Sequence, residues 1–175
     1  MNPLLAKIQE DIEAKISEEQ KEDFLNAVKA GKHILFDPST HQNMELIKNP
    51  ASRKDPVNTI ANGVAGLGYV MYMQSKKQIS PDVLIPALIV LMCEVMDFGE
   101  QSFGLQVDNQ LVAATTKELI AQIYTKLGVK PEDLQQAVEK GRQEILDSQN
   151  QPQEAPQEPQ APGMLPTAGA QNVPA

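Results

Sequence analysis

The fold is decided by the stretch SPDVLIPALIVLMC, residues 80–93, which has no polar side chain from Val83 to Cys93. A helix with this composition is apolar all round and belongs in the interior of a domain. Ser80 and Pro81 are typical of a helix start. Pro86 lies past the first turn, where it removes one hydrogen bond and is expected to kink the helix. The stretch therefore predicts a central helix.

Apolar residues at helical spacing predict further helices on both sides. Two stripes lie upstream, at residues 4–16 and 24–35. Between them, Ser17-Glu18-Glu19-Gln20 is typical of a capping box, so the region is either two helices or one long helix. Asp37-Pro38 is expected to end it. The remaining helices are predicted at residues 40–48, from Asp55-Pro56 to about Lys77, at 111–127 with Gly128 as its end, and at 131–147.

The last 28 residues have a different composition. Residues 148–175 hold 6 of the 13 prolines and no Lys, Arg or aromatic side chain. Such a segment cannot bury enough apolar surface to fold. The sequence therefore predicts an all-α fold: a compact bundle of about five to six helices over residues 1–147, followed by a disordered tail at 148–175.

The predicted domain is acidic overall. All 15 Lys and Arg and 21 of the 23 Asp and Glu precede residue 148, and the net charge of the whole chain is −8. Binding to nucleic acid requires a basic face, so DNA and RNA are not expected as partners. The single Cys93 cannot form an internal disulfide, and the N-terminus is unlike a signal peptide. We therefore expect synthesis in a reducing cytoplasm.

Candidate chemical sites are few. His33 and His41 lack a third metal ligand at usable spacing. Residues 63–68, GVAGLG, do not match the GxGxxG pattern and follow a helix start rather than a strand. The acidic residues from Glu94 to Glu100 have no His or Lys nearby in sequence, so a solvated or partner-facing helix surface is expected rather than acid–base chemistry. The sequence therefore predicts no catalytic, cofactor or metal site, and a non-enzymatic protein.

Two apolar segments raise the question of a membrane. Residues 63–73 and 83–93 are each eleven residues long, whereas a spanning helix needs about 20. Extending either segment brings in charged or amide side chains. Two buried core helices are the main interpretation. Conditional membrane insertion, with Gly63, Gly66 and Gly68 at helix contacts, is the disfavoured alternative.

Small residues on one side of the helix that begins at Asp55-Pro56 leave a flat strip for another helix. The candidate interface residues are Ala61, Ala65, Gly68, Tyr72, Leu88 and Leu91. If a second copy of the chain covers them, the protein is a homo-oligomer. If the two helices pack on each other within one chain, the same residues belong to the core.

The order of features over residues 79–175 resembles small virion structural proteins of tailed bacteriophages. These features are an apolar helix opened by Ser80-Pro81, an amphipathic helix from Val107 to Val129, and a Gln/Pro/Gly tail containing Gly163-Met164-Leu165-Pro166. The resemblance lies in layout, and no site residues are carried over from it. It implies a structural protein of the virion, made in the host cytoplasm, with other virion proteins or itself as partners. Two alternatives remain: a membrane-active phage protein, of the ejection-channel or holin-like kind, and a host-directed regulatory binding protein.

Overall fold

Helix α5 (Pro81–Phe103) is the central element of the structure, a computed structural model that describes residues 1–37, 49 and 54–129. Eleven of its residues are buried, and it contacts all four of the other described helices. The central helix predicted from residues 80–93 is confirmed. The helix continues through Pro86, which cannot donate the usual backbone hydrogen bond to the carbonyl of Asp82.

The N-terminal region forms two helices, α1 (Pro3–Glu13) and α2 (Glu18–Phe36), rather than one long helix. Ser17 is the N-cap of α2, but the predicted capping box is wrong. The Ser17 hydroxyl lies 3.1 Å from Oε1 of Gln20 and makes no side-chain hydrogen bond to the backbone of the first turn. Helix α2 ends at Phe36 because Asp37, which precedes a proline, adopts an extended backbone with φ −69° and ψ 130°.

The third and fifth described helices are α4 (Pro56–Gln74) and α6 (Asn109–Lys126), and each begins at a capping aspartate. Asp55 accepts a hydrogen bond from the backbone N–H of Asn58 at 3.1 Å, and Asp108 accepts one from Leu111 at 2.7 Å. Helix α6 stops just before Gly128, as predicted, and Gly128 has a φ of 81°. Each cap satisfies a backbone donor that the helix itself leaves free.

Helix α4 was expected to reach about Lys77, but it ends at Gln74, about one turn earlier. Lys76 and Lys77 both have left-handed backbones, with φ of 55° and 66°. The N–H of Lys77 donates to the carbonyl of Tyr72 at 2.9 Å, and that of Lys76 donates to Met73 at 3.0 Å. This hydrogen-bond pattern is that of a Schellman motif, in which two non-glycine residues occupy positive φ.

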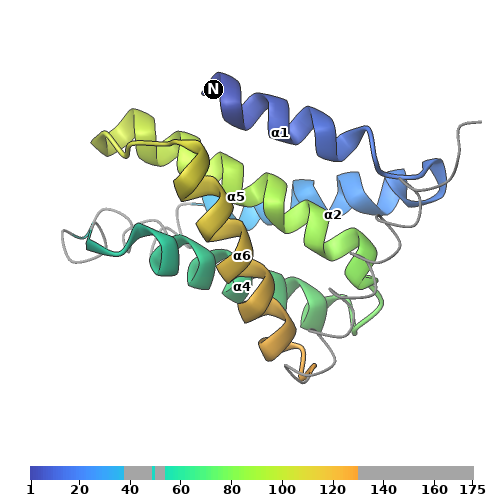
Figure 1. The fold of residues 1–175 in the computed structure, drawn as a ribbon. Helices are drawn as coiled ribbons and strands as arrows, with labels where there is room; N and C mark the ends of the chain where they lie inside the picture. Colours follow the sequence, from blue (N-terminus) through green and yellow to red (C-terminus); the bar gives the residue numbers. More distant parts are fainter. Residues whose placement is uncertain (38–48, 50–53, 130–175) are drawn as a thin grey trace, which may run out of the picture. The chain divides into compact units, whose positions relative to one another are not determined.

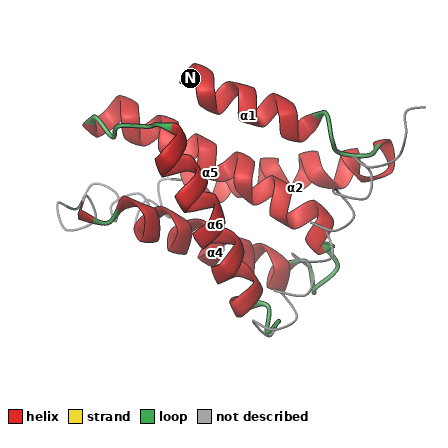
Figure 2. Ribbon diagram, in the orientation of Figure 1, coloured by secondary structure: helices red, strands yellow, loops and turns green. Residues whose placement is uncertain are grey.

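The helices pack around α5 (Figure 1). Helix α4 makes its most extensive contact with α6, while α1 and α2 both pack on α5, and α2 also contacts α4. Every regular element in the described residues is a helix (Figure 2), which confirms the all-α class. The helices predicted at residues 40–48 and 131–147, and the predicted tail at 148–175, lie outside the described residues.

Candidate interaction surface

The predicted interface strip of α4 faces the interior of its own chain. Ala61 and Ala65 have no exposed surface, and Gly68 is buried. A Cβ atom built on Gly68 would lie 2.5 Å from a methyl group of Leu88 on α5 and 3.2 Å from one of Ile123 on α6. The small residues therefore allow close approach, as expected, but to helices of the same molecule.

The other three predicted interface residues follow the same pattern. Leu88 and Leu91 are fully buried, and Tyr72 is half-buried against the core. Intramolecular packing, the alternative stated from the sequence, thus describes these residues, and five of the six are inaccessible to a second copy. The prediction that this strip is the interface between two copies is therefore wrong, because the strip is buried within one chain.

The opposite side of α4 remains exposed. We call it the α4 outer face and define it by Asn62, Gly66, Tyr69, Val70 and Met73, which lie on one side of the helix. Tyr69, Val70 and Met73 are 40%, 42% and 45% exposed, which is high for large apolar side chains. A Cβ on Gly66 would meet nothing within 4 Å. The sequence pattern did not single this face out, because apolar residues occur all round α4.

Charge sets α4 apart from the other described helices. Pro56–Gln74 contains no Asp, Glu, Lys, Arg or His, whereas α1, α2, α5 and α6 each carry charged side chains. An exposed helix face normally carries charges that interact well with water. The α4 outer face therefore combines exposed apolar side chains with an absence of charge.

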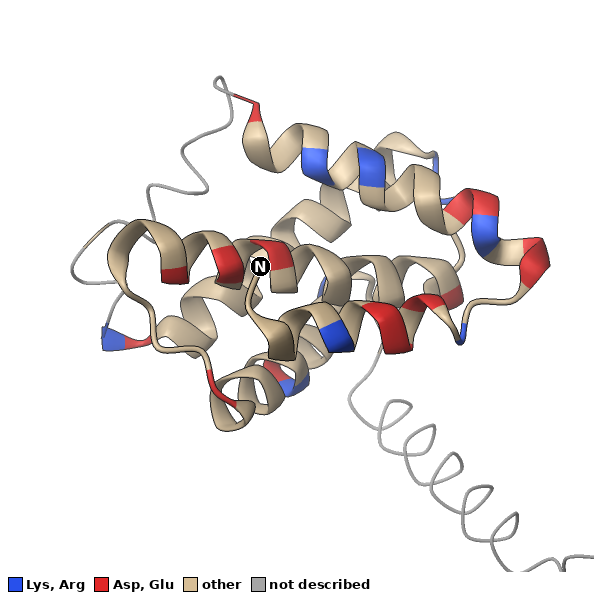
Figure 3. Cartoon of the chain, turned by 90° about the horizontal axis from the view of Figure 1, so that it is seen from above, with Lys and Arg blue, Asp and Glu red and all other residues tan. Residues whose placement is uncertain are grey.

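The acidic row of α5 holds α1 and α2 in place instead of facing a partner. The backbone N–H of Asn2 donates to Asp97 at 2.8 Å, and the Asn2 side-chain amide donates to both carboxylate oxygens of Glu100 at 2.9 Å. Lys32 on α2 lies 2.7 Å from Glu94. Figure 3 shows acidic positions of α5 close to the N-terminus of the chain. The solvated or partner-facing surface expected from sequence is thus largely an intramolecular contact.

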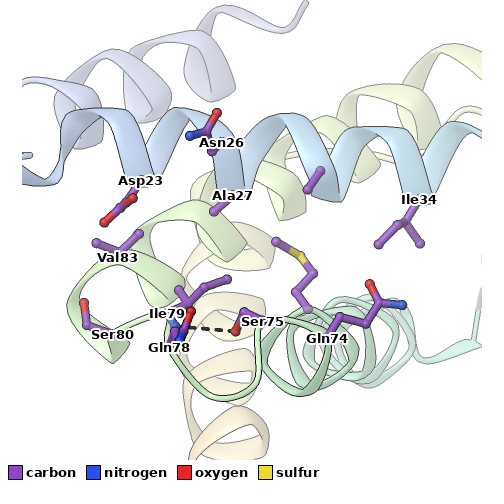
Figure 4. A pocket seen from close by; sticks show the side chains of 12 residues that line it. Asp23, Asn26, Ala27, Ile34, Gln74, Ser75, Gln78, Ile79, Ser80 and Val83 are labelled. Atoms are coloured by element: carbon purple, nitrogen blue, oxygen red, sulfur yellow. Dashed lines mark hydrogen bonds between the residues drawn. The ribbon is translucent and has the colours of Figure 1, made fainter.

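A pocket of about 510 Å³ lies between α2, the end of α4 and the start of α5 (Figure 4). Ala27, Met71 and Val83 line it with apolar groups, and Asp23 is the one charged side chain among its lining residues. The Ser75 hydroxyl donates to the carbonyl of Tyr72 at 2.8 Å and accepts the N–H of Ile79 at 3.5 Å, which orders the connection between α4 and α5.

A second, shallower hollow lies between α4 and α6, lined by Asn62 and by residues of α6. There Gln122 donates from its amide nitrogen to Glu118 at 2.8 Å. The carbonyl oxygen of Gln122 is buried without a hydrogen-bond partner among the described residues. This hollow borders the α4 outer face at Asn62.

The side chains that could take part in chemistry include one cysteine and two histidines. Burial and the neighbouring Glu94 carboxylate raise the pKa of Cys93 to about 12, so its thiol stays protonated at neutral pH. His33 is exposed on α2, and His41 lies outside the described residues. Within the described ranges, no group of three or more His, Cys, Asp or Glu could hold a metal ion.

None of the helices within residues 1–37 and 54–129 is long and apolar enough to cross a bilayer. No family model, curated protein or solved structure matches the chain.

Proposed function

We propose that the chain is a non-enzymatic bacteriophage virion protein, capsid-internal, ejected or portal-associated, that acts in structure or assembly through helix-mediated protein contacts. The α4 outer face is the observation that supports it. Three large apolar side chains are exposed on a helix without charge, while the other described helices carry charges on their exposed sides.

Leaving the α4 outer face in water costs free energy. Burial of apolar surface contributes about 25 cal/mol for each Å² removed from water. A helix without charged groups loses little hydration energy when it is covered, so the desolvation of charge does not oppose binding there. The face therefore favours a protein partner with a complementary apolar surface.

The assignment to a virion rests on the resemblance in layout over residues 79–175. A structural role needs surfaces for docking rather than reactive groups, and the α4 outer face is such a surface. The membrane-active and host-directed alternatives would use the same face, against lipid in the first case and against a host protein in the second.

Quantitative mass spectrometry of purified particles tests the proposal. The phage that encodes the chain is purified by density gradient, and the copy number per particle is measured against labelled peptides. We expect multiple copies in every particle. Absence from particles, together with accumulation in the host cytosol or membrane fraction, would contradict the virion assignment and favour one of the two alternatives.

A pair of matched variants tests the role of the surface. Met73→Glu places a carboxylate in the α4 outer face, whereas Leu25→Glu places one at an equally exposed apolar position on α2; the wild-type side chains are 45% and 53% exposed. We expect Met73→Glu to reduce incorporation into particles about tenfold or more, because a charge is buried at the contact. Leu25→Glu should be incorporated normally. Equal incorporation of both variants would contradict docking through α4.

A further inference from the structure

We propose that α1 detaches from α5 as a unit while the other described helices stay folded, and that the contacts of Asn2 control how often it does so. The inference concerns a movement built into the fold and does not depend on the virion assignment. Three features carry it: the small share of α1 in the core, the polar contacts at its start, and its exposed connection to α2.

Helix α1 has the smallest share of the core among the described helices. Leu5 is its one buried residue, and Leu4, Ile8 and Ile12 are partly buried against the core. By contrast, α2 and α6 each bury four residues, α4 buries seven and α5 eleven. Helix α1 packs chiefly on α5 at the periphery of the bundle (Figure 1), whereas α2 and α6 each contact both α4 and α5. Elements with few buried contacts open most readily, so α1 is expected to open first.

The length of α1 makes its opening cooperative. The helix has 11 residues, and isolated helices shorter than about 12–15 residues are marginal in water. Once α1 leaves α5, no comparable packing surface supports it. Its backbone hydrogen bonds are therefore lost together, and its amides exchange with solvent as a group.

Asn2 attaches the start of α1 to α5. Its backbone N–H donates to Asp97 at 2.8 Å, and its side-chain amide donates to both carboxylate oxygens of Glu100 at 2.9 Å. The amino group of Met1 lies 3.8 Å from Asp97. The Asn2 side-chain oxygen also accepts the N–H of Leu4 at 2.9 Å, as the N-cap of α1. Hydrogen bonds to ionised groups are roughly twice as strong as those between neutral groups, so Asn2 is the main polar attachment.

The carboxylates beneath α1 keep other partners when it leaves. The amide nitrogen of Gln9 lies 3.2 Å from Glu94 and 3.4 Å from a backbone carbonyl of α5, which makes it a longer and weaker attachment. Lys32 of α2 pairs with the same Glu94 at 2.7 Å, and Gln101 donates to Asp97 at 2.6 Å. Opening of α1 therefore leaves neither Glu94 nor Asp97 without a hydrogen-bond donor.

The connection between α1 and α2 is short and mostly exposed. Of residues 14–17, Ile16 is partly buried against the core and the other three are exposed. A few residues at the ends of elements are enough to absorb the change in backbone angles at a hinge. Helix α1 can therefore move away from α5 while α2 stays in place.

Native-state hydrogen exchange of the full chain tests whether α1 opens separately. We expect the amides of residues 6–13 to share similar protection factors, at least about 100-fold lower than those of the slowest amides of α5. Equal protection in α1 and α5 would overturn the proposal, because α1 would then open only when the whole domain unfolds. Protection factors that differ by more than about tenfold along α1 would also overturn it, because they would show fraying of single turns.

A variant in α6 separates local opening from global unfolding. Ile123→Val removes one methylene group from a fully buried side chain, and it should lower the protection of the slowest α5 amides about two- to tenfold. The protection of α1 should stay unchanged, because α6 is folded before and after α1 opens. An equal fall in both helices would overturn separate opening.

Asn2→Asp tests the attachment. Aspartate keeps the N-cap function, but its carboxylate faces Asp97 and Glu100 and has no amide to donate. We expect the protection of α1 to fall about tenfold or more. Asn109→Asp makes the same change in charge at the exposed first residue of α6 and should leave α1 unchanged. Equal effects of the two variants on α1 would overturn the role of Asn2.

A double variant tests the contact between Asn2 and Glu100 itself. In Asn2→Asp/Glu100→Gln the donor and the acceptor exchange sides, and the net charge is that of the wild type. The protection of α1 should return to within about fivefold of the wild-type value. Protection as low as in Asn2→Asp alone would overturn this contact as the control on α1.

Discussion

At the scale of single residues, two glycines of α4 have opposite surroundings. Gly68 is buried where α4 approaches α5 and α6, and Gly66 faces open space. Both lie within one helix, so the intrinsic helix preference of a replacement is the same at the two positions. Any difference in the free energy of unfolding between matched variants then reports packing alone.

We therefore predict opposite effects of the same substitution. Gly68→Leu should lower the free energy of unfolding by about 1–3 kcal/mol or more, because the added side chain overlaps Leu88 and Ile123. Gly66→Leu should raise it by up to about 1 kcal/mol, because leucine is the better helix former. Urea denaturation of monomeric protein, in the low micromolar range, measures both. Equal effects at the two positions would contradict the packing described for α4.

Cys93 gives a pH-dependent prediction at the same scale. Its pKa is raised from 9.0 to about 12 in the folded state, so the unfolded thiol ionises at lower pH than the folded one. The contribution of Cys93 to stability is therefore fully present below pH 9 and is lost as the pH rises from 9 towards 12. The expected loss is about 1 kcal/mol at pH 10.

The measurement compares wild type with Cys93→Ala in urea at pH 7 and pH 10. The variant removes the titrating thiol and leaves a small cavity whose cost does not depend on pH, so the gap between the two proteins should narrow at pH 10. Thiol labelling of the native chain at pH 8 should also proceed no faster than unfolding. Rapid labelling would show that Cys93 is accessible.

At the scale of elements, the ends of α4 and α6 have the same motif with different residues. Gly128 and Lys76 occupy the corresponding left-handed positions, with φ of 81° and 55°. Glycine adopts this backbone without steric cost, whereas for lysine the same conformation costs about 1 kcal/mol of conformational free energy. The connection between α4 and α5 therefore contains strain that the connection after α6 does not.

Lys76→Gly should raise the free energy of unfolding by up to about 1 kcal/mol, reduced by the entropy that glycine adds to the unfolded chain. Gly128→Ala, the converse change, should lower it by about 1 kcal/mol. Thermal denaturation of both variants provides the measurement. A loss of stability in Lys76→Gly would mean that the lysine side chain makes a favourable contact that outweighs its backbone cost.

At the scale of the whole molecule, charged side chains are distributed unevenly among the described helices. Carboxylates on α5 accept hydrogen bonds from the first residues of the chain and from α2, while α4 carries no charge and leaves an apolar face exposed. One side of the protein is thus held together by polar contacts within the chain.

The contribution of residues 148–175 stays a prediction from composition, because they lie outside the described residues. Their deletion should leave the helical circular dichroism signal and the melting temperature nearly unchanged. A fall in melting temperature of more than about 5 °C, corresponding to roughly 1 kcal/mol, would show that the segment contributes to the folded domain.

The sequence by itself determined the helices, because helix formation depends on local signals. Asp55-Pro56 and Ser80-Pro81 predicted the starts of α4 and α5. Apolar spacing alone predicted α6 from residue 111, close to its observed start at Asn109. Errors fell where the local signal was weak. The predicted end of α4 lies too far along the chain, because lysine rarely adopts the positive φ that follows this helix.

Only the tertiary structure decided which surfaces are covered. Apolar residues occur on every side of α4, so its pattern could not show that Ala61 and Gly68 face inward while Tyr69 and Met73 face outward. The partner of Glu94 was likewise hidden, because Lys32 is 62 residues away in the sequence. Burial and ion pairing depend on contacts between distant segments, and those contacts are set by how whole helices pack.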